Sequence, residues 1–160
     1  RDVAVTGVQT CALPILQEEF ITELEMLHDY QFNISFDDQG LADIRSDEPV
    51  PVGSGEYPNA TRYLSAAVGN CLCASLAFCL RKARSEPVSI KARVRTVLGR
   101  NDKGRLRVKN MQVTIYPEVD DPAKLERCLP LFEDFCTVSA AVREGIDIQV
   151  SVETPKNEQR

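Results

Sequence analysis

One stretch decides the fold: residues 58–84 read PNATRYLSAAVGNCLCASLAFCLRKAR. Asn59 suits a helix N-cap, because its side chain can accept a hydrogen bond from a first-turn amide. Apolar and small residues then recur at three- and four-residue spacing as far as Cys79, which predicts one long α-helix. Glu86 and Pro87 end it, since the residue before a proline disfavours helical backbone. A helix this apolar on most sides is typical of a core or of a contact between subunits.

Three cysteines lie on this expected helix: Cys71, Cys73 and Cys79. Cys71 and Cys73 are two positions apart, so their side chains point in nearly opposite directions and cannot bind one ion together. The simplest interpretation of all three is that they are small core residues. The uninterrupted apolar run is too short for a membrane span and contains Asn70, so we expect no membrane partner.

Composition excludes several function classes. A chain of 160 residues can form a single domain with a sizeable core. Its net charge of −5 does not suggest nucleic-acid binding, and its lone histidine, His28, leaves little room for a Cys-His pair or a His-rich metal site. We therefore expect no metal and no cofactor. Six cysteines in an acidic chain with no evident signal peptide indicate reduced thiols in the cytoplasm.

The first residues have an unusual origin. Residues 5–15 read VTGVQTCALPI, which resembles the translation of a sequencing adapter. We expect residues 1–15 to be an artefact tail outside the fold, residues 16–154 to form the domain, and residues 155–160 to be a polar tail.

Two alternating runs precede the long helix. Apolar residues recur at every second position from Phe20 to Met26 and from Phe32 to Phe36, which predicts a β-hairpin turning near Asp29. A third short strand is expected within residues 41–45. Residues 47–58 are rich in glycine and proline and predict a loop.

Two more strands follow the helix. Residues 88–98 alternate, residues 99–104 suit a hairpin loop, and residues 106–116 return as a strand. The apolar phase shifts near Asn110, which predicts a bulge. These strands carry two rows of basic residues, which indicate either an anion- or nucleic-acid-binding patch or, as we favour, a solvated or salt-bridged face. The rows are Lys91, Arg93 and Arg95, and Arg105, Arg107 and Lys109.

The remaining chain predicts short helices and a last strand. Asp121 and Pro122 suit an N-cap and first helical position, and Pro130 should split the helix that follows. A further helix is expected over residues 134–145, and residues 146–150 alternate as a strand. The expected order is βββ-α-ββ-α-α-β, an α+β fold with a mainly antiparallel sheet.

Cys136 is the second candidate for chemistry. It lies near the start of the expected helix, where backbone amides favour a thiolate. Glu133 and Asp134 would oppose the thiolate if they faced the sulfur. We expect Cys71 and Cys136 to meet in space, and Cys128 to be a core residue.

Three segments together resemble the OsmC/Ohr family of osmotically induced and organic hydroperoxide resistance proteins. They are NATRYLSAAVGNC at residues 59–71, FEDFCTVS at residues 132–139, and VREGI at residues 142–146. The resemblance implies an intertwined homodimer with two long central helices back to back. It also implies a thiol peroxidase: one cysteine attacks an organic hydroperoxide, the second resolves the sulfenic acid to a disulfide, and a dithiol reductant reopens it.

By position, the resemblance makes Cys71 the peroxidatic cysteine and Cys136 the resolving one. Hydroperoxide-reductase members carry a glutamate ten residues before the first cysteine, where this chain has Thr61. They also hold the thiolate with an arginine, for which Arg45 and Arg62 are the candidates. The alternatives are a non-catalytic dimer that binds a small apolar or thiol ligand and, least favoured, a structural metal domain.

Overall fold

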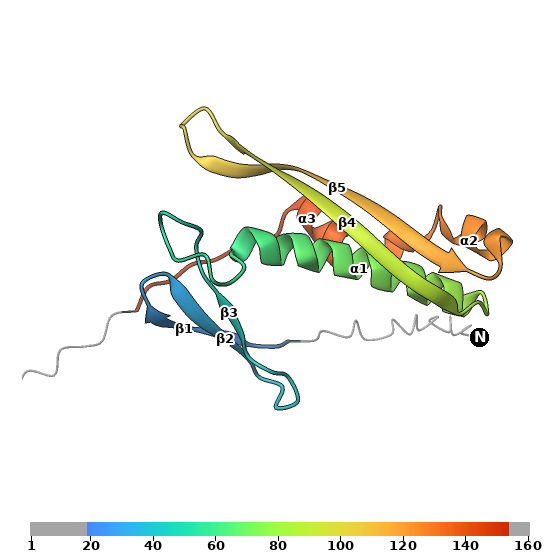
Figure 1. Cartoon of the computed structure of the whole chain (residues 1–160), viewed down its shortest axis with the longest axis horizontal. Helices are drawn as coiled ribbons and strands as arrows, with labels where there is room; N and C mark the ends of the chain where they lie inside the picture. The colour runs from blue at the N-terminus through green and yellow to red at the C-terminus, as the bar shows by residue number, and fades with distance from the viewer. Residues whose placement is uncertain (1–18, 154–160) are drawn as a thin grey trace, which may run out of the picture. The chain divides into compact units, whose positions relative to one another are not determined.

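The computed structural model describes residues 19–153. The expected tails at residues 1–15 and 155–160, and the expected domain boundaries, lie outside the described residues. The chain divides after Tyr57 into two compact units, whose strands and helices are labelled in Figure 1.

The first unit is a small antiparallel sheet in the order β1-β2-β3. Strand β1 (Thr22–His28) pairs with β2 (Gln31–Phe36), which pairs with β3 (Ile44–Ser46). The expected hairpin is confirmed, and its turn places Asp29 at a positive φ of 48°. The third strand is shorter and later than expected. The loop after it is fastened by the buried Asp47, which accepts hydrogen bonds from the Ser54 hydroxyl and the Glu56 amide.

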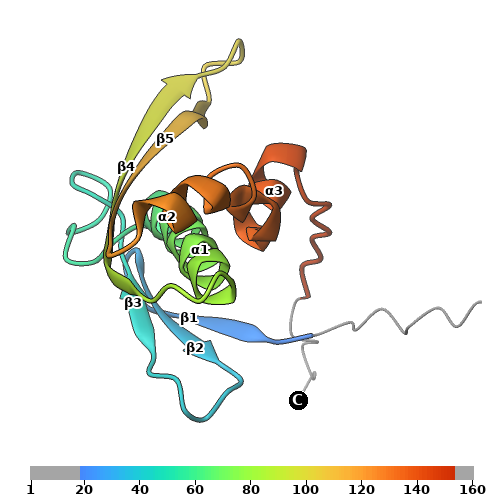
Figure 2. The same ribbon diagram turned by 90° about the vertical axis from the view of Figure 1, so that its right-hand side faces the viewer.

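The second unit is built around helix α1 (Ala60–Lys82), as the opening stretch predicted. Asn59 is its N-cap, and its side chain accepts a hydrogen bond from the Arg62 amide at 3.1 Å. Seen along its axis, α1 has the β4–β5 ribbon on one side and the later helices on another (Figure 2). By length and composition α1 could cross a membrane, a test that the core helix of a soluble protein also passes.

The ribbon consists of β4 (Pro87–Arg100) and β5 (Leu106–Val119), paired antiparallel. The expected bulge is confirmed: the register shifts between Val97 and Leu98, which leaves Lys109 as the extra residue. The register also keeps the two basic rows apart. Arg93 lies opposite Thr114 and Arg95 opposite Gln112, so like charges do not face each other across the ribbon.

Gly69 lets α1 approach the ribbon closely. It is buried, and a Cβ atom added there would lie 2.7 Å from Cγ2 of Val94 on β4. Such a distance is too short for two carbon atoms. The missing side chain therefore sets how near the helix lies to the strand.

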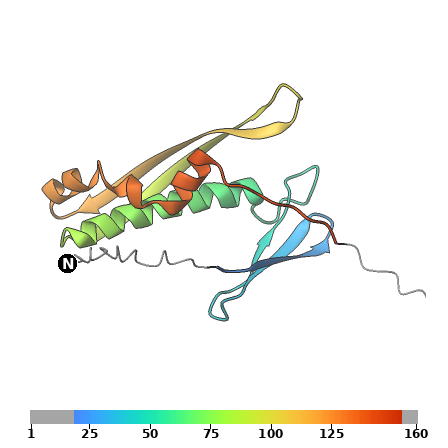
Figure 3. The same ribbon diagram turned by 180° about the vertical axis from the view of Figure 1, so that it is seen from behind.

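Three short helical segments follow the ribbon. They are α2 (Pro122–Cys128), the 3-10 segment η1 (Phe132–Phe135) and α3 (Thr137–Glu144). Asp121 caps α2 as predicted, and the chain breaks around Pro130 as predicted. From behind, these segments follow α1 from its C-terminal end back toward its middle (Figure 3).

Two expectations about the C-terminal part were wrong. The helix expected from residue 134 begins only at Thr137, because Cys136 has extended backbone (φ −90°, ψ 94°) and acts as its N-cap. The expected last strand is not formed: residues 145–153 have neither helix nor strand. An alternating apolar pattern forms a strand only where a neighbouring strand can accept and donate its backbone hydrogen bonds. Ile148 remains 78% exposed and Val150 82% exposed.

Candidate functional site

The structure brings Cys71 and Cys136 together. Cys71 lies in the middle of α1, and Cys136 is the N-cap of α3. Cys71 packs against the buried cluster that contains Cys136, so the two thiols are close enough to affect each other's pKa. Both lie among apolar side chains, with Val68 and Leu72 of α1 fully buried beside Cys136. The two thiols therefore form a pair within one chain, and their catalytic roles remain predictions.

The two sulfur atoms differ in exposure. Cys136 is 1% exposed, whereas Cys71 is only partly buried. A peroxide arriving from solvent would therefore meet Cys71 first.

They also differ in the stability of the thiolate. Burial raises the pKa of the Cys71 thiol, and the hydrogen bond to Cys136 raises it further. Burial also pushes the pKa of Cys136 upward, but hydrogen bonds from Cys71, Ser139 and Ser75 outweigh it and hold that pKa below its ordinary value. The proton of the pair is thus held by Cys71, and Cys136 is the favoured thiolate.

Local structure supplies the donors to Cys136. The Ser139 amide donates to Cys136 Sγ at 3.4 Å, as expected for an N-cap side chain. Ser75 follows Cys71 by one helical turn, and its hydroxyl donates to the Cys71 carbonyl at 2.8 Å. From the sequence we expected backbone amides at Cys136 but did not single out Ser75. A serine four residues after a candidate cysteine on the same helix was the available signal.

The three candidates for thiolate stabilisation belong to α1 and β3. Thr61 and Arg62 are in the first turn of α1, roughly 15 Å along the axis from Cys71. Arg45 belongs to β3, where its guanidinium donates to the Tyr57 hydroxyl at 3.2 Å and lies over the Tyr57 ring. Within α1, neither Thr61 nor Arg62 reaches the Cys71 thiol, so the roles proposed for all three remain predictions.

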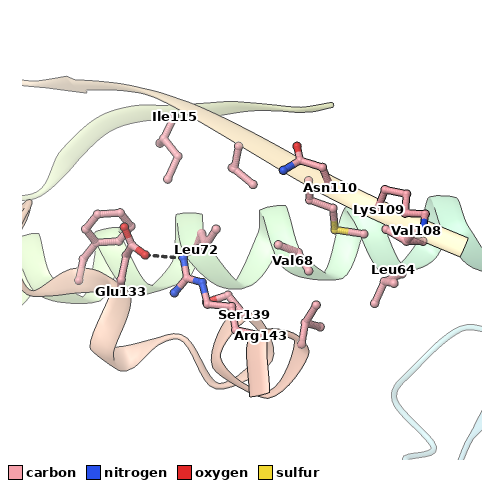
Figure 4. A pocket seen from close by; sticks show the side chains of 14 residues that line it. Leu64, Val68, Leu72, Val108, Lys109, Asn110, Ile115, Glu133, Ser139 and Arg143 are labelled. Atoms are coloured by element: carbon pink, nitrogen blue, oxygen red, sulfur yellow. Dashed lines mark hydrogen bonds and ion pairs between the residues drawn. The ribbon is translucent and has the colours of Figure 1, made fainter. Parts of the chain in front are cut away.

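A pocket of about 510 Å³ lies beside the pair, between α1, β5 and α3. Figure 4 shows its side chains, with Leu64, Val68 and Leu72 along the helix and Ser139 and Arg143 on the facing segment. Val68, Leu72 and Ser139 line this pocket and also pack against or contact Cys136, so the pocket adjoins the side chains around the thiol pair. Arg143 and Glu133 form an exposed ion pair at 2.6 Å along its edge.

Metal binding has no ready site in this arrangement. Within residues 19–153, no group of three or more His, Cys, Asp or Glu side chains is placed to hold an ion. Cys73 is partly buried, and its pKa is raised by burial.

Comparison with known proteins identifies the class. The family model described as OsmC-like protein matches residues 53–151, so this chain belongs to the OsmC-like family. No curated protein matches the sequence.

Solved structures share the fold. An OsmC-like protein of unknown function from Vibrio cholerae aligns with a TM-score of 0.67 at 16% identity, covering 78% of this chain and 94% of that one. A Legionella pneumophila protein described as an organic hydroperoxide resistance protein aligns with a TM-score of 0.60 at 13% identity, covering 87% and 99%. The organic hydroperoxide resistance protein OhrB of Bacillus subtilis aligns with a TM-score of 0.55 at 16% identity, covering 81% and 94%. The α+β OsmC-like fold, with antiparallel strands, one long helix and shorter helices, is thereby confirmed.

Proposed function

We propose that this protein reduces organic hydroperoxides with the Cys71–Cys136 pair, at the expense of a dithiol reductant. The single observation that carries this function is the contact between two thiols on separate elements beside a largely apolar pocket. Similarity in fold to organic hydroperoxide resistance proteins supports the same chemistry.

The reaction begins with a proton transfer inside the pair. Cys71 is the more accessible sulfur but holds the proton, so its proton passes along the hydrogen bond to the Cys136 thiolate. The Cys71 thiolate then attacks the O–O bond, becomes a sulfenic acid and releases an alkoxide. Cys136 returns the proton to that alkoxide, which leaves as an alcohol.

The second step, in which the sulfenic acid is converted to a disulfide, uses only the same two cysteines. The Cys136 thiolate attacks the Cys71 sulfenic acid, forms the disulfide and expels hydroxide, which takes a proton to become water. A dithiol then reduces the disulfide in two exchange steps and leaves as its own disulfide. Each cycle consumes one hydroperoxide and one dithiol and yields one alcohol and one water.

A homodimer is part of the same proposal. One face of α1 carries a stripe that stays exposed in the single chain and is apolar apart from one asparagine: Ala67, Asn70, Ala74 and Phe78. Phe78 is 45% exposed. A second copy of α1 laid along this stripe would bury it. We place the protein in the cytoplasm, where its thiols would stay reduced.

The test measures consumption of cumene hydroperoxide with dihydrolipoamide as reductant. Cys71→Ser should abolish turnover. Cys136→Ser should also stop turnover but leave a sulfenic acid on Cys71 that a dimedone-type reagent traps. Cys73→Ser is the matched control, because Cys73 lies on the same helix with its side chain directed elsewhere, and it should keep full activity.

The alternative function is a non-catalytic dimer that binds a small apolar or thiol ligand. Thr61 in place of the family glutamate and the raised pKa of Cys71 favour it. Turnover no faster than that of free dithiol, with Cys71 unmodified after exposure to peroxide, would decide for this alternative.

A further inference from the structure

A second pair of thiols lies outside the candidate site. Cys79 on α1 is 8% exposed, and Cys128 at the end of α2 is 1% exposed. They share a buried cluster with Leu76 and Leu80. Burial raises the pKa of Cys128 to about 11, and the neighbouring Cys79 thiol adds to the rise.

The two pairs repeat one arrangement. Cys79 follows Cys71 by eight residues on α1, and Cys128 precedes Cys136 by eight residues. The returning chain therefore runs back along α1 and sets a cysteine beside a cysteine at two points. Eight helical residues span roughly 12 Å, so the pairs are too far apart to exchange a disulfide directly.

Few polar contacts hold α2 at its crossing. Lys124 donates to the Arg84 carbonyl at 2.9 Å and lies 3.7 Å from Asp121. The helix has seven residues, and Pro130 follows it closely. A short segment held this way can separate from α1 by local opening, which would expose both sulfur atoms to a reagent.

We propose that Cys79 and Cys128 are a second redox site, whose oxidation to a disulfide covalently joins α2 to the C-terminal half of α1. The oxidant is a small-molecule disulfide of the glutathione type. When α2 opens, the thiolate of one cysteine attacks that disulfide, forms a mixed disulfide and releases one small thiol. The thiolate of the other cysteine then displaces the second small thiol. The protein gives up two electrons and two protons, and the reagent becomes two thiols.

This site does not depend on hydroperoxide chemistry. Cys71 and Cys136 take no part in it, so its failure would leave the proposed function standing, and the reverse also holds. The linkage closes a long loop containing the whole β4–β5 ribbon, so it should stabilise the fold substantially.

The experiment isolates the pair in the full-length chain. A variant with Cys11, Cys71, Cys73 and Cys136 replaced by serine keeps only Cys79 and Cys128. After exposure to oxidised glutathione, we expect the mass to show two fewer alkylation sites and no glutathione adduct, and peptide mapping to show the 79–128 linkage. The melting temperature should rise by roughly 10 °C.

Cys79→Ser in the same background is the control, and it should end as a glutathione adduct or remain unreacted. Both thiols still alkylatable after prolonged oxidation, or a linkage between two chains, would overturn the site. A linkage that lowers the melting temperature would overturn the stabilising role. If the variant does not fold, isotope-coded alkylation of the wild-type chain followed by chymotryptic digestion gives the same answer, because cleavage after Phe78 separates Cys71 from Cys79 and cleavage after Phe135 separates Cys128 from Cys136.

Discussion

At the scale of single residues, the backbone conformation of Cys136 influences which of the two thiols has the lower pKa. Cys136 has extended backbone and caps α3, so its sulfur receives the Ser139 amide. Burial raises the pKa of Cys71 by more than the Val138 and Ser139 amides lower it. Of the two sulfur atoms, the buried one therefore loses its proton more readily, and the accessible one holds its proton more tightly.

A substitution of Ser75 tests this difference in pKa between Cys71 and Cys136. Ser75→Ala removes a hydroxyl that helps to lower the pKa of Cys136 and that donates to the Cys71 carbonyl, so we expect the peroxidase rate at neutral pH to fall about two- to tenfold. Ser65→Ala is the control, since Ser65 also donates to the carbonyl four residues before it, that of Thr61, and its other hydrogen-bond partner is Thr96 on β4, not a cysteine. Equal rates in the two variants would contradict the assigned role of Ser75.

The pH dependence of the reaction should follow Cys136. A lowered pKa means that the pair loses its first proton at a lower pH than a free dithiol. The rate should therefore persist below the ordinary thiol range and fall only as the pH drops through this lowered pKa. Stopped-flow rates across a pH series measure it. A rate that falls already in the range of an unperturbed thiol would show that Cys136 is not stabilised.

Cys128 predicts the opposite pH effect on stability. Its pKa is raised from 9.0 to about 11 in the folded chain, so the folded state keeps a proton that the unfolded state loses. This contribution is complete below pH 9 and is lost as the pH rises toward 11, by up to roughly 2–3 kcal/mol. Urea unfolding of wild type and Cys128→Ala at a series of pH values measures it, and the variant should show the weaker decline.

At the scale of elements, the sequence predicted most of the second unit. Asn59 and Asp121 mark helix starts by capping, Pro130 marks a break, and the phase shift near Asn110 marks the bulge. These signals are local and depend on a few adjacent residues. The contact of Cys79 with Cys128 could not be predicted, because spacing along the chain does not give the depth at which two helices cross.

The packing of α1 on β4 gives a prediction at this scale. Gly69→Ala places a Cβ atom against Val94, so we expect a loss of about 1–2 kcal/mol even though alanine favours helix. Val94→Ala combined with Gly69→Ala should recover part of that loss by making room. Denaturant unfolding of the two single variants and the double variant measures the coupling, and strictly additive changes would show that the two residues do not touch.

At the scale of the whole molecule, the missing last strand and the exposed face of α1 have one explanation. Residues 146–152 alternate as a strand does, yet they lack a partner within the described chain. The sequence predicted a strand from this pattern. This strand does not form in the single chain, because a strand needs backbone hydrogen bonds to a neighbouring strand. Both features fit a proposed homodimer.

Ala74 tests that assembly. Ala74→Glu puts a charge on the exposed stripe of α1 and should shift the protein to monomer in analytical ultracentrifugation. Thr114→Glu, on an exposed position of β5, is the control and should leave the mass unchanged. Because both cysteines of the pair come from one chain, the monomeric variant should still form the 71–136 disulfide. A dimer that survives Ala74→Glu would place the interface elsewhere.

The β4–β5 turn has a consequence for how the protein would break. Lys103 is exposed at the tip of this hairpin, the kind of loop end that proteases cut first. The cut falls between Cys71 and Cys136 along the chain. A trypsin-nicked molecule would separate into two fragments on a denaturing gel if its thiols were reduced, and would migrate as one piece if they were joined. The size of the fragments on the gel would thus show whether the thiols are oxidised, without any dye or label.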